Sequence, residues 1–327
     1  MLIVPAVDVE RLLDPDTLID AVGEAMAELS AGRASMPSRI AAMVDERDAF
    51  LGVMPAYVPS SGALETKLVS VFPWNTDRPT HQAVVVVFDP ENGTPVGLLD
   101  GTSITEARTA AGSALSARLL ARVDAEVLAI VGTGVQAGSH LRYVSRVRAF
   151  KRVVIAGREP RKAEQLASEV RADLGAPVAV VGSIEEAVRE AGVVCVATHA
   201  DRPVIRREWL RPGTHVTSVG YNIAGAGELD TDTVADAAVF VESRAAALAP
   251  PPAGAVELLR AIEAGRITED HVRAEVGEVV AGTAPGRESP DEITLYKSVG
   301  VAAQDAAAAM LVLGAARREG IGTEIEL

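Results

Sequence analysis

Two hydrophobic patterns divide this chain into regions of different architecture. Between residues 38 and 100, short apolar runs such as AFLGVMPAYV (49–58) and QAVVVVFD (82–89) are separated by turn-rich segments such as DPENGT (89–94). Because no helical connector joins these runs, they predict a mostly antiparallel sheet. From residue 126 onward, strand-like runs alternate with helical patterns, which predicts a parallel sheet with helices on both faces. The predicted fold class is α/β, with a Rossmann-type doubly wound domain and a smaller α+β domain.

Three longer helices are predicted beside these sheets. Asp14 and Pro15 suit the start of a first helix, and Gly32 suits its end. The segment 102–123 is rich in strong helix formers and is long enough to bridge the two domains. The alanine-rich segment 298–320 follows a strand-like run and is expected to pack back on the first domain.

A lysine interrupts the strand pattern ALETKLVSVF (63–72). With a period of two, Glu65, Lys67, Val69 and Val71 share one face of this strand, and the opposite face is also largely apolar. A lysine in such a place can protect an edge strand from aggregation. The alternative is that Lys67 belongs to a buried functional site.

The segment EVLAIVGTGVQAGSHL (126–141) is the strongest local signal in the chain. After an apolar strand it carries the G-x-G-x-x-A pattern with Gly132, Gly134 and Ala137, and Val135 and Gln136 lie within the same turn. The first glycine permits a tight turn, the second lets a pyrophosphate approach the backbone, and the small third residue lets helix and strand pack closely. The N-terminus of the following helix offers N–H groups to phosphates. The pattern predicts a dinucleotide site, and a simple tight βα turn is the alternative.

The end of the second parallel strand bears on the choice of cofactor. NAD sites usually place a carboxylate there, but RVVIAGREPRK (152–162) has Gly157 followed by Arg158, with Arg161 and Lys162 nearby. A guanidinium binds a 2′-phosphate through two parallel hydrogen bonds. NADP(H) is therefore favoured, and NAD(H) is the alternative because Glu159 could also face the ribose.

Composition and charge narrow the class of partner. The formal net charge of -14 and the isoelectric point near 4.9 argue against a nucleic-acid groove and against an anionic membrane surface, since both need basic patches. Cys195 is the single cysteine of the 327 residues, which excludes an intramolecular disulfide and a multi-cysteine metal site. We interpret it as a buried core thiol. The N-terminal segment has no targeting pattern, and we expect a cytoplasmic protein without a metal cofactor.

Several motifs, taken in order, resemble one family. MPSRI (36–40), LETKLVSVFP (64–73), TSITEARTAA (102–111), IVGTGVQA (130–137), SVGYNIAGAGELD (218–230) and LYKSVGVAAQDAAAA (295–309) are similar to the ornithine cyclodeaminase/mu-crystallin family over essentially the whole chain. The resemblance implies a substrate-binding and dimerisation domain formed by residues 1–119 and 300–327, and an NAD(P)-binding domain formed by residues 120–299. It also implies a homodimer that passes hydride between a nicotinamide and the Cα of a small imino or amino acid.

The resemblance implies roles for several polar residues of the first domain. Arg39 and Arg108 match arginines that face the substrate carboxylate, and Lys67 matches a lysine that binds this carboxylate or exchanges a proton with the substrate nitrogen. Thr80 and His81 match positions that line the substrate pocket, although His81 could equally be a structural histidine. Three cations around one empty site would be costly, which favours an anionic ligand.

The same resemblance implies cofactor contacts from Thr109, Thr198, Val219 and Ser298. Asn222 stands where cyclodeaminases and alanine dehydrogenases carry an aspartate, so it could bind a substrate nitrogen but could not take its proton.

Gly52 stands where ornithine cyclodeaminases carry a glutamate. Both departures favour an NAD(P)H-dependent oxidoreductase similar to a ketimine reductase or an alanine dehydrogenase. A redox-neutral ornithine cyclodeaminase is the first alternative. A non-catalytic, NADP-dependent ligand-binding protein is the second.

Overall fold

A computed structural model describes residues 1–220, 227–250 and 253–326 of the chain. The chain divides into two compact units, one formed by residues 1–108 with 300–327 and the other by residues 109–299. The boundary predicted at residues 119 and 120 falls at the end of α3 (Gly101–Leu120), whereas the units divide inside this helix. A continuous helix carries no local sequence signal at the point where its packing partners change.

The first unit contains a mostly antiparallel sheet with the strand order β15-β1-β6-β5-β4-β3-β2. Within the described part of the chain, β1 and β6 are the only parallel pair of this sheet. The strands are β1 (Leu2–Val4), β2 (Ile40–Val44), β3 (Ala49–Val58), β4 (Ala63–Val71), β5 (His81–Phe88), β6 (Pro95–Asp100) and β15 (Thr323–Glu324). The predicted antiparallel sheet is confirmed, but β1 and β15 were not predicted because such short strands carry almost no periodic signal.

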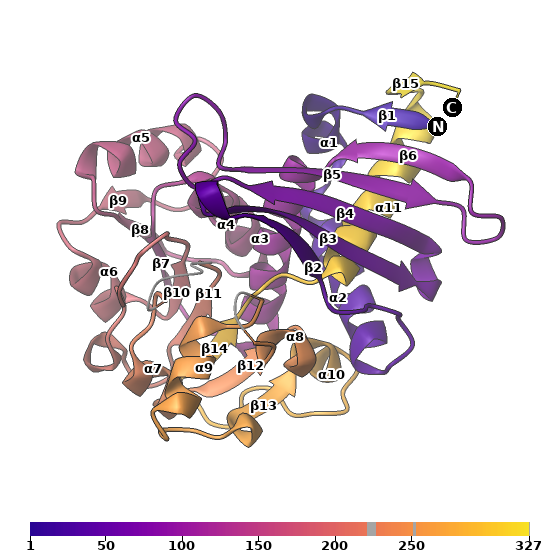
Figure 1. Cartoon of the computed structure of the whole chain (residues 1–327). Helices are drawn as coiled ribbons and strands as arrows, with labels where there is room; N and C mark the ends of the chain where they lie inside the picture. The colour runs from indigo at the N-terminus through magenta and orange to yellow at the C-terminus, as the bar shows by residue number, and fades with distance from the viewer. Residues whose placement is uncertain (221–226, 251–252, 327) are drawn as a thin grey trace. The chain divides into compact units, whose positions relative to one another are not determined.

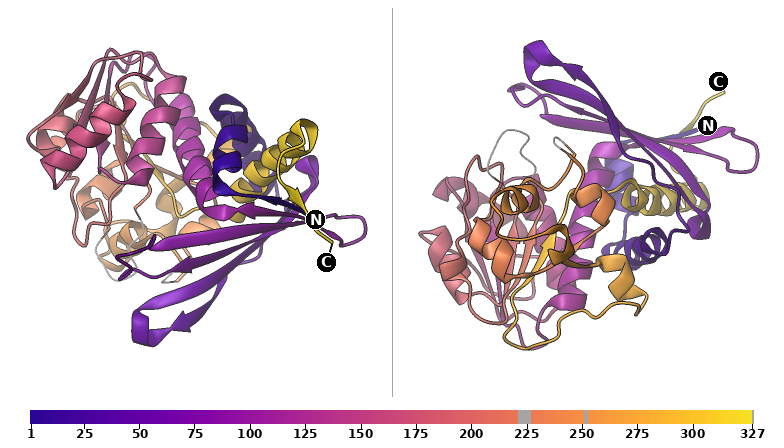
Figure 2. Two further views of the ribbon diagram at one scale, coloured as in Figure 1. Left: turned by 90° about the horizontal axis from the view of Figure 1, so that it is seen from above. Right: turned by 60° about the horizontal axis from the view of Figure 1, so that its bottom comes forward.

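Helices cover one face of this sheet. They are α1 (Ala6–Leu12), α2 (Pro15–Ser30) and α11 (Ala302–Glu319), and the short 3-10 turns η1 (Asp45–Arg47) and η2 (Pro59–Ser61) join the strands. The yellow helix α11 crosses β3 and β4, and α2 packs beside it (Figure 1). Both helices lie on the same side of the sheet (Figure 2). Asp14 caps α2 as predicted, since its carboxylate accepts a hydrogen bond from Thr17 N.

The position of β4 corrects one interpretation of Lys67. This strand lies between β3 and β5, so the proposal of a protective edge-strand lysine is wrong. Alternate residues of β4, including Glu65 and Lys67, are buried and point toward the helix-covered face. The two-residue period predicted this shared face correctly.

The second unit contains a parallel sheet with the strand order β13-β12-β14-β11-β10-β7-β8-β9. The strands are β7 (Val127–Val131), β8 (Arg152–Ala156), β9 (Val178–Val180), β10 (Val193–Val196), β11 (His215–Ser218), β12 (Ala238–Val241), β13 (Val272–Glu275) and β14 (Thr294–Lys297). With β7 taken as the first, the five strands β9-β8-β7-β10-β11 follow the order 3-2-1-4-5 of a doubly wound dinucleotide-binding fold, and β14 takes the sixth place. The predicted Rossmann-type sheet is confirmed, although β12 and β13 were not predicted.

The helices of the second unit pack around an aliphatic core that includes Val131, Val194 and Leu295. Cys195 is buried in β10, as predicted, and burial raises the pKa of its thiol to about 12. Besides the second half of α3, the helices are α4 (Val135–Val147), α5 (Pro160–Val170), α6 (Ile184–Glu190), α7 (Thr231–Asp236), α8 (Arg244–Ala247), α9 (Val256–Glu263) and α10 (Val276–Val280), with 3-10 turns η3 (Arg207–Trp209) and η4 (Glu269–His271). Among the described residues, no helix combines the length and apolar character needed to span a membrane.

Candidate functional site

Lys67 is the centre of a buried charged cluster in the first unit. Its side chain is 1% exposed, and Nζ donates a hydrogen bond of 2.8 Å to Asp305 Oδ2. A longer contact of 3.4 Å joins Nζ to Thr105 Oγ1 at the start of α3. On this face of the sheet, the ammonium group of Lys67 therefore donates its hydrogen bonds to side chains of α11 and α3 and not to water.

Arg108 approaches the same carboxylate from α3. Its Nε lies 3.0 Å from Asp305 Oδ1, and its Nη1 lies 3.2 Å from Gln304 Oε1. Asp305 is completely buried, so its two oxygens join the lysine and the arginine in a water-excluded bridge. Charge-assisted hydrogen bonds of this kind fix the directions of both cations.

Arg39 reaches the chain just before α11. Its Nη2 donates a hydrogen bond of 2.7 Å to Gly300 O. Gly300 has a φ of +70°, and a Cβ at this position would lie 2.6 Å from Arg108 Nη1. The glycine thus lets two guanidinium groups approach one short backbone segment. The structure brings Arg39, Lys67 and Arg108 together, although they lie far apart in the sequence.

Burial changes the protonation of this cluster. Desolvation, opposed by Asp305 and assisted by Arg108, lowers the pKa of Lys67 to about 8. Despite its own burial, the pKa of Asp305 lies below its ordinary value because Lys67 and Arg108 favour the carboxylate. Lys67 can therefore gain and lose a proton near neutral pH, whereas Asp305 stays ionised.

Glu65 is a second buried carboxyl group on the Lys67 face of β4. It is 2% exposed, and neither carboxyl oxygen has a hydrogen-bond partner among the described residues. Desolvation, followed by the Asp305 charge, raises its pKa well above the ordinary value. Burial thus disfavours the charged form of Glu65, and the carboxylate that directly contacts Lys67 and Arg108 is that of Asp305.

Asp305 changes the electrostatic argument made from the sequence. Three cations around an empty site were expected, but Asp305 supplies a counter-ion for Lys67 and Arg108. Two cations on one carboxylate still favour an anionic ligand such as a carboxylate. Sequence reasoning missed Asp305 and Glu65, and the available signal for Asp305 was a single acidic residue within the alanine-rich segment VAAQDAAAA (301–309).

The two predicted pocket residues at the start of β5 differ in their surroundings. Thr80 is exposed, and its carbonyl accepts a hydrogen bond of 2.8 Å from Phe72 N. His81 is half-buried and pairs with Val71. Desolvation, with further contributions from Lys67 and Arg108, lowers the pKa of His81 to about 4. The imidazole is neutral at pH 7 and adds no charge to the cluster.

The glycine-rich turn after β7 has the features that a dinucleotide requires. Gly132 has a φ of +126°, and a Cβ there would lie 2.2 Å from Ala197 O, so only glycine fits. At Gly134, the N-cap of α4, a Cβ would meet no atom within 4 Å. No packing within the chain requires this glycine, and the open space beside it fits a closely approaching pyrophosphate. Ala137 is buried, as predicted for the third position.

The remaining residues of the turn are held by α3. Val135 is exposed, and the carbonyl of Gln136 contacts His140 Nδ1 at 2.7 Å. His140 Nε2 contacts Ser113 Oγ at 2.8 Å, which fixes the first turn of α4 against α3. The sequence did not reveal these contacts of His140, because a histidine inside a helix gives no specific signal.

Gly157 at the end of β8 lies close to the glycine-rich turn. A Cβ at this position would lie 2.6 Å from Thr133 Cγ2, so a larger residue would require the Thr133 side chain to move. Arg158 is exposed beside it. Lys162 forms an ion pair of 2.9 Å with Glu159, which also lowers the pKa of Glu159.

The other predicted cofactor residues follow strand ends of the second unit. Thr198 follows β10, and both its N and its Oγ1 donate to Glu228 Oε1. Val219 follows β11, and Ser298 follows β14 and donates its hydroxyl to Glu242. Thr109 is buried in α3. Asn222, predicted to be catalytic, lies outside the described residues.

The fold places this protein in the α/β class, with one Rossmann-type unit. Comparison with known proteins identifies its family. The model of the "Ornithine cyclodeaminase/mu-crystallin family" matches residues 1–320, and the chain belongs to this family. Its relatives include "Ketimine reductase mu-crystallin" of Macropus fuliginosus, which is 38% identical over 313 residues, with coverage of 93% of this chain and 94% of the relative. The family predicted from the sequence is thereby confirmed.

Solved structures agree with this assignment. The Thermococcus litoralis Delta(1)-pyrroline-2-carboxylate reductase in complex with NADH and L-proline has a TM-score of 0.94 and 36% identity, with coverage of 99% of this chain and 100% of that chain. An archaeal alanine dehydrogenase dimer with bound NAD has a TM-score of 0.91 and 31% identity, with coverage of 100% and 99% respectively. The two-domain α/β fold predicted from the sequence is therefore confirmed.

Proposed function

We propose that this protein is an NAD(P)H-dependent reductase of a small imino acid that carries a carboxylate next to its C=N bond. Oxidoreductases that use a nicotinamide and act on imino or amino acids are the class to which its relatives belong. The observation that carries the narrower proposal is the buried cluster of Lys67, Arg108 and Asp305, with Arg39 beside it. An excess of positive charge at a titratable lysine suits a carboxylate whose neighbouring nitrogen must receive a proton.

The proposed roles follow from the chemistry of each side chain. Arg39 and Arg108 bind and orient the substrate carboxylate, because a guanidinium matches a carboxylate with paired hydrogen bonds. Lys67 supplies the proton to the imine nitrogen, and Asp305 fixes the direction of the lysine. A bound nicotinamide supplies hydride chemistry, and the turn from Gly132 to Ala137 would hold its pyrophosphate.

NADP(H) is the preferred cofactor in this proposal. The close approach of Thr133 to Gly157 supports it, since a ribose-binding carboxylate cannot replace this glycine without a shift. Arg158 is exposed at the same strand end and can bind a 2′-phosphate. Arg158→Gln should lower kcat/KM with NADPH by about tenfold and leave the value with NADH almost unchanged. Arg161→Gln is the control, and an equal effect of both substitutions would contradict the assignment.

Reduction is favoured over redox-neutral cyclodeamination by the environment of Gly52. A Cβ at this position would lie 3.3 Å from Val69 Cγ1, so a glutamate there would require Val69 to move. This chain therefore lacks the carboxyl group that the resemblance assigns to ornithine cyclodeaminases. The position that would carry it is tightly packed. This packing supports the reductase as the leading function.

The decisive experiment is a screen of cyclic imino acids, and of 2-oxo acids with amines, each with NADPH and with NADH. A reductase oxidises one cofactor molecule for each product molecule formed, which the absorbance of the reduced nicotinamide measures. Ammonia release from ornithine without a net absorbance change would instead show a cyclodeaminase. Tight binding of NADPH and of an imino acid without turnover would show a ligand-binding protein.

We also propose that the protein forms a homodimer through the outer face of its first sheet. Ile40, Val53, Leu68 and Val84 form a continuous apolar row across four strands on the face opposite α11. Ile40 is 68% exposed and Val84 39% exposed in the single chain, which is unusual for neighbouring apolar residues. A dimer is also present in the alanine dehydrogenase structure. The cytoplasmic location stays a prediction.

The dimer proposal can be tested with one substitution and a matched control. Val84→Glu should convert the dimer to a monomer in size-exclusion chromatography with light scattering, because it places a charge in the apolar row. Val7→Glu changes an exposed valine of α1 and should leave the dimer intact. A monomeric wild-type protein would contradict the proposal.

A further inference from the structure

Two neighbouring strand ends in the second unit are joined by one buried carboxylate. Strands β10 and β11 run parallel, and Val196 at the end of β10 pairs with Ser218 at the end of β11. The chain then leaves the sheet through Thr198 on one side and Gly220 on the other. In a doubly wound sheet, ligands bind outside these carboxyl ends.

Glu228 accepts hydrogen bonds from both segments. Its Oε1 lies 2.6 Å from Thr198 N and 2.8 Å from Thr198 Oγ1. Its Oε2 lies 2.8 Å from Ser218 Oγ and 2.8 Å from Gly220 N. The side chain is 1% exposed. One buried carboxylate therefore satisfies two backbone N–H groups and two hydroxyl groups.

The adjoining glycine is matched to this carboxylate. A Cβ at Gly220 would lie 2.3 Å from Glu228 Cδ and 2.6 Å from Thr198 O. No larger residue fits while the carboxylate stays in place. The geometry of the segment after β11 and the position of Glu228 therefore depend on each other.

Lys297 and Glu257 extend this hydrogen-bond network to β14. Lys297 Nζ lies 3.1 Å from Ser218 Oγ, from Gly220 O and from Glu257 Oε1. The same Glu257 oxygen accepts a hydrogen bond of 2.9 Å from Glu228 N. Burial raises the pKa of Glu228, whereas Lys297 lowers it. The lysine thus offsets part of the negative charge of the two carboxylates and ties the ends of β10, β11 and β14 together.

The strand order indicates which half of a dinucleotide this connection serves. The order in which the strands are added to the sheet reverses at β7, between β8 on one side and β10 on the other. We assign the turn after β7 to the pyrophosphate. The adenosine half belongs to the β8 side, where Gly157 and Arg158 lie. In a fold of this order, the other mononucleotide half lies over the strands on the opposite side, which are β10 and β11.

We propose that Glu228 is a positioning residue for the nicotinamide half of the cofactor. This inference rests on the proposed use of NAD(P)H. Glu228 acts through the backbone of Thr198 and Gly220, which it holds at the fixed separation that a bound nicotinamide needs. It does not itself react with the substrate.

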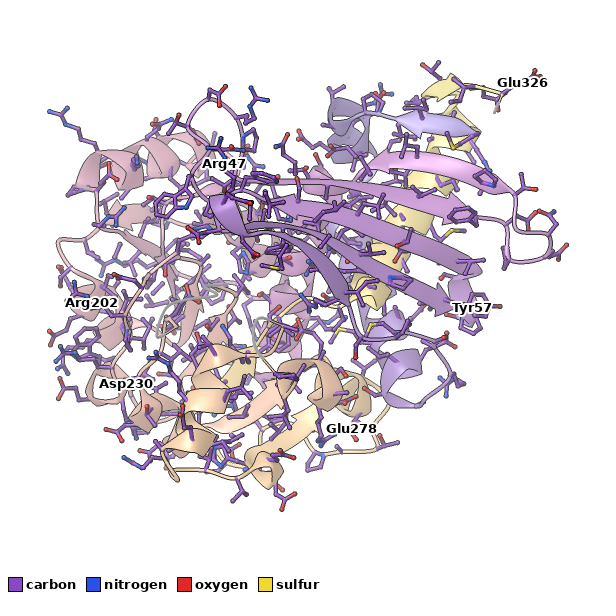
Figure 3. The ribbon with its side chains drawn as sticks, viewed as in Figure 1. Arg47, Tyr57, Arg202, Asp230, Glu278 and Glu326 are labelled. Carbon is purple, nitrogen blue, oxygen red and sulfur yellow. The ribbon has the colours of Figure 1, made fainter. Side chains whose placement is uncertain are left out.

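The substitution Glu228→Gln separates this role from simple stability. A glutamine amide can accept from only one side, so the N–H of either Thr198 or Gly220 would face an NH₂ group and be displaced. Asp230→Asn is the matched control. Asp230 also accepts from two backbone N–H groups, those of Thr233 and Arg207, at the start of α7 (Figure 3) and not at the strand ends.

The measurement is fluorescence titration of each variant with NADPH and, separately, with adenosine 2′,5′-bisphosphate, which lacks the nicotinamide half. Glu228→Gln should raise the Kd for NADPH about tenfold and leave the Kd for adenosine 2′,5′-bisphosphate within about twofold. Asp230→Asn should change neither by more than about twofold. In the reductase assay, Glu228→Gln should lower kcat by about 10²-fold, because a displaced nicotinamide misaligns the hydride.

Three results would overturn the assignment. They are unchanged NADPH binding in Glu228→Gln, equal weakening of NADPH and of adenosine 2′,5′-bisphosphate, and equal effects of Glu228→Gln and Asp230→Asn. If Glu228→Gln does not fold, Gly220→Ala displaces the same carboxylate and should give the same selective loss. A wild-type protein that binds neither NADPH nor NADH would instead refute the proposed function itself.

Discussion

The two buried charged clusters of this protein use similar residues for different purposes. In the first unit, Lys67 and Arg108 share the single carboxylate of Asp305, and positive charge remains in excess. In the second unit, both oxygens of Glu228 are occupied by donors from the chain, and Lys297 offsets the carboxylates. The first cluster can therefore accept an anion, whereas the second has no excess of positive charge to offer one.

This difference shows that burial of a lysine next to a carboxylate does not by itself identify a functional site. The balance of charge decides whether a ligand is needed. Unpartnered oxygens do not separate the two clusters, because Glu65 in the first and Glu257 in the second both have a buried carboxyl oxygen without a hydrogen-bond partner among the described residues.

The largest expected effect is the loss of turnover in Lys67→Met. Removal of a group that transfers a proton should lower kcat/KM by about 10²- to 10⁴-fold and leave the Kd for NADPH unchanged. Lys151→Met is the control, since Lys151 is an exposed lysine paired with Glu126. Steady-state reduction of an imino acid and cofactor titration measure both quantities. Full activity of Lys67→Met would remove the lysine from the mechanism.

Asp305→Asn should have the next largest effect, on stability. The substitution leaves two buried cations without an anion, and loss of one member of a buried ion pair costs about 3 to 5 kcal/mol. Urea denaturation measures the free energy of unfolding. Glu319→Gln, at an exposed ion pair of the same helix, should cause no measurable change. A stable Asp305→Asn protein would show that the cations can lose their charge or reach water.

Acid should destabilise the second unit through His140. Burial lowers its pKa in the folded protein to about 4, whereas an ordinary histidine titrates near 6.5. The unfolded chain therefore binds the proton first, and stability that is complete above about pH 6.5 is lost as the pH falls toward 4. At pH 5 the loss is about 2 kcal/mol from this residue. The difference in unfolding free energy between pH 7.5 and 5 should shrink in His140→Gln and stay the same in the control His199→Gln.

The smallest expected effect is the pH dependence of kcat/KM, which reports the ionisation of Lys67. Because its pKa is about 8, kcat/KM for imine reduction should fall about tenfold for each pH unit above 8. Oxidation of the corresponding amino acid needs the unprotonated lysine, so its kcat/KM should rise with pH up to about 8 and level off above it. Lys67→Arg keeps its charge at high pH and should lose this dependence in the residual activity. Identical pH profiles for the wild-type protein and the Lys67→Arg variant would assign the ionisation to another group.

Much of the fold could be predicted because its signals are local. The glycines of the turn after β7 lie within a few residues of each other, and the alternation of strands and helices is visible along the chain. The face shared by Glu65 and Lys67 followed from the two-residue period. The strands β1, β12 and β13 escaped prediction because runs of three or four residues contain too few periods.

The partners of the charged residues could not be predicted in the same way. Lys67 and Asp305 are separated by 238 positions, and Arg108 and Asp305 by 197. Glu228 resembled an ordinary acidic residue before the short helix α7, and only its four hydrogen bonds distinguish it. Resemblance to a family indicated the cations, but it did not indicate the carboxylates that hold them.

The sequence by itself determined the α/β class, the dinucleotide turn and the family, since each depends on backbone geometry or on ordered motifs encoded within short segments. The tertiary structure decided which charges are neutralised inside the chain and which remain for a ligand. The physical reason is that the energy of a buried charge depends on its nearest partners and on the exclusion of water, and both are created only when distant segments pack together.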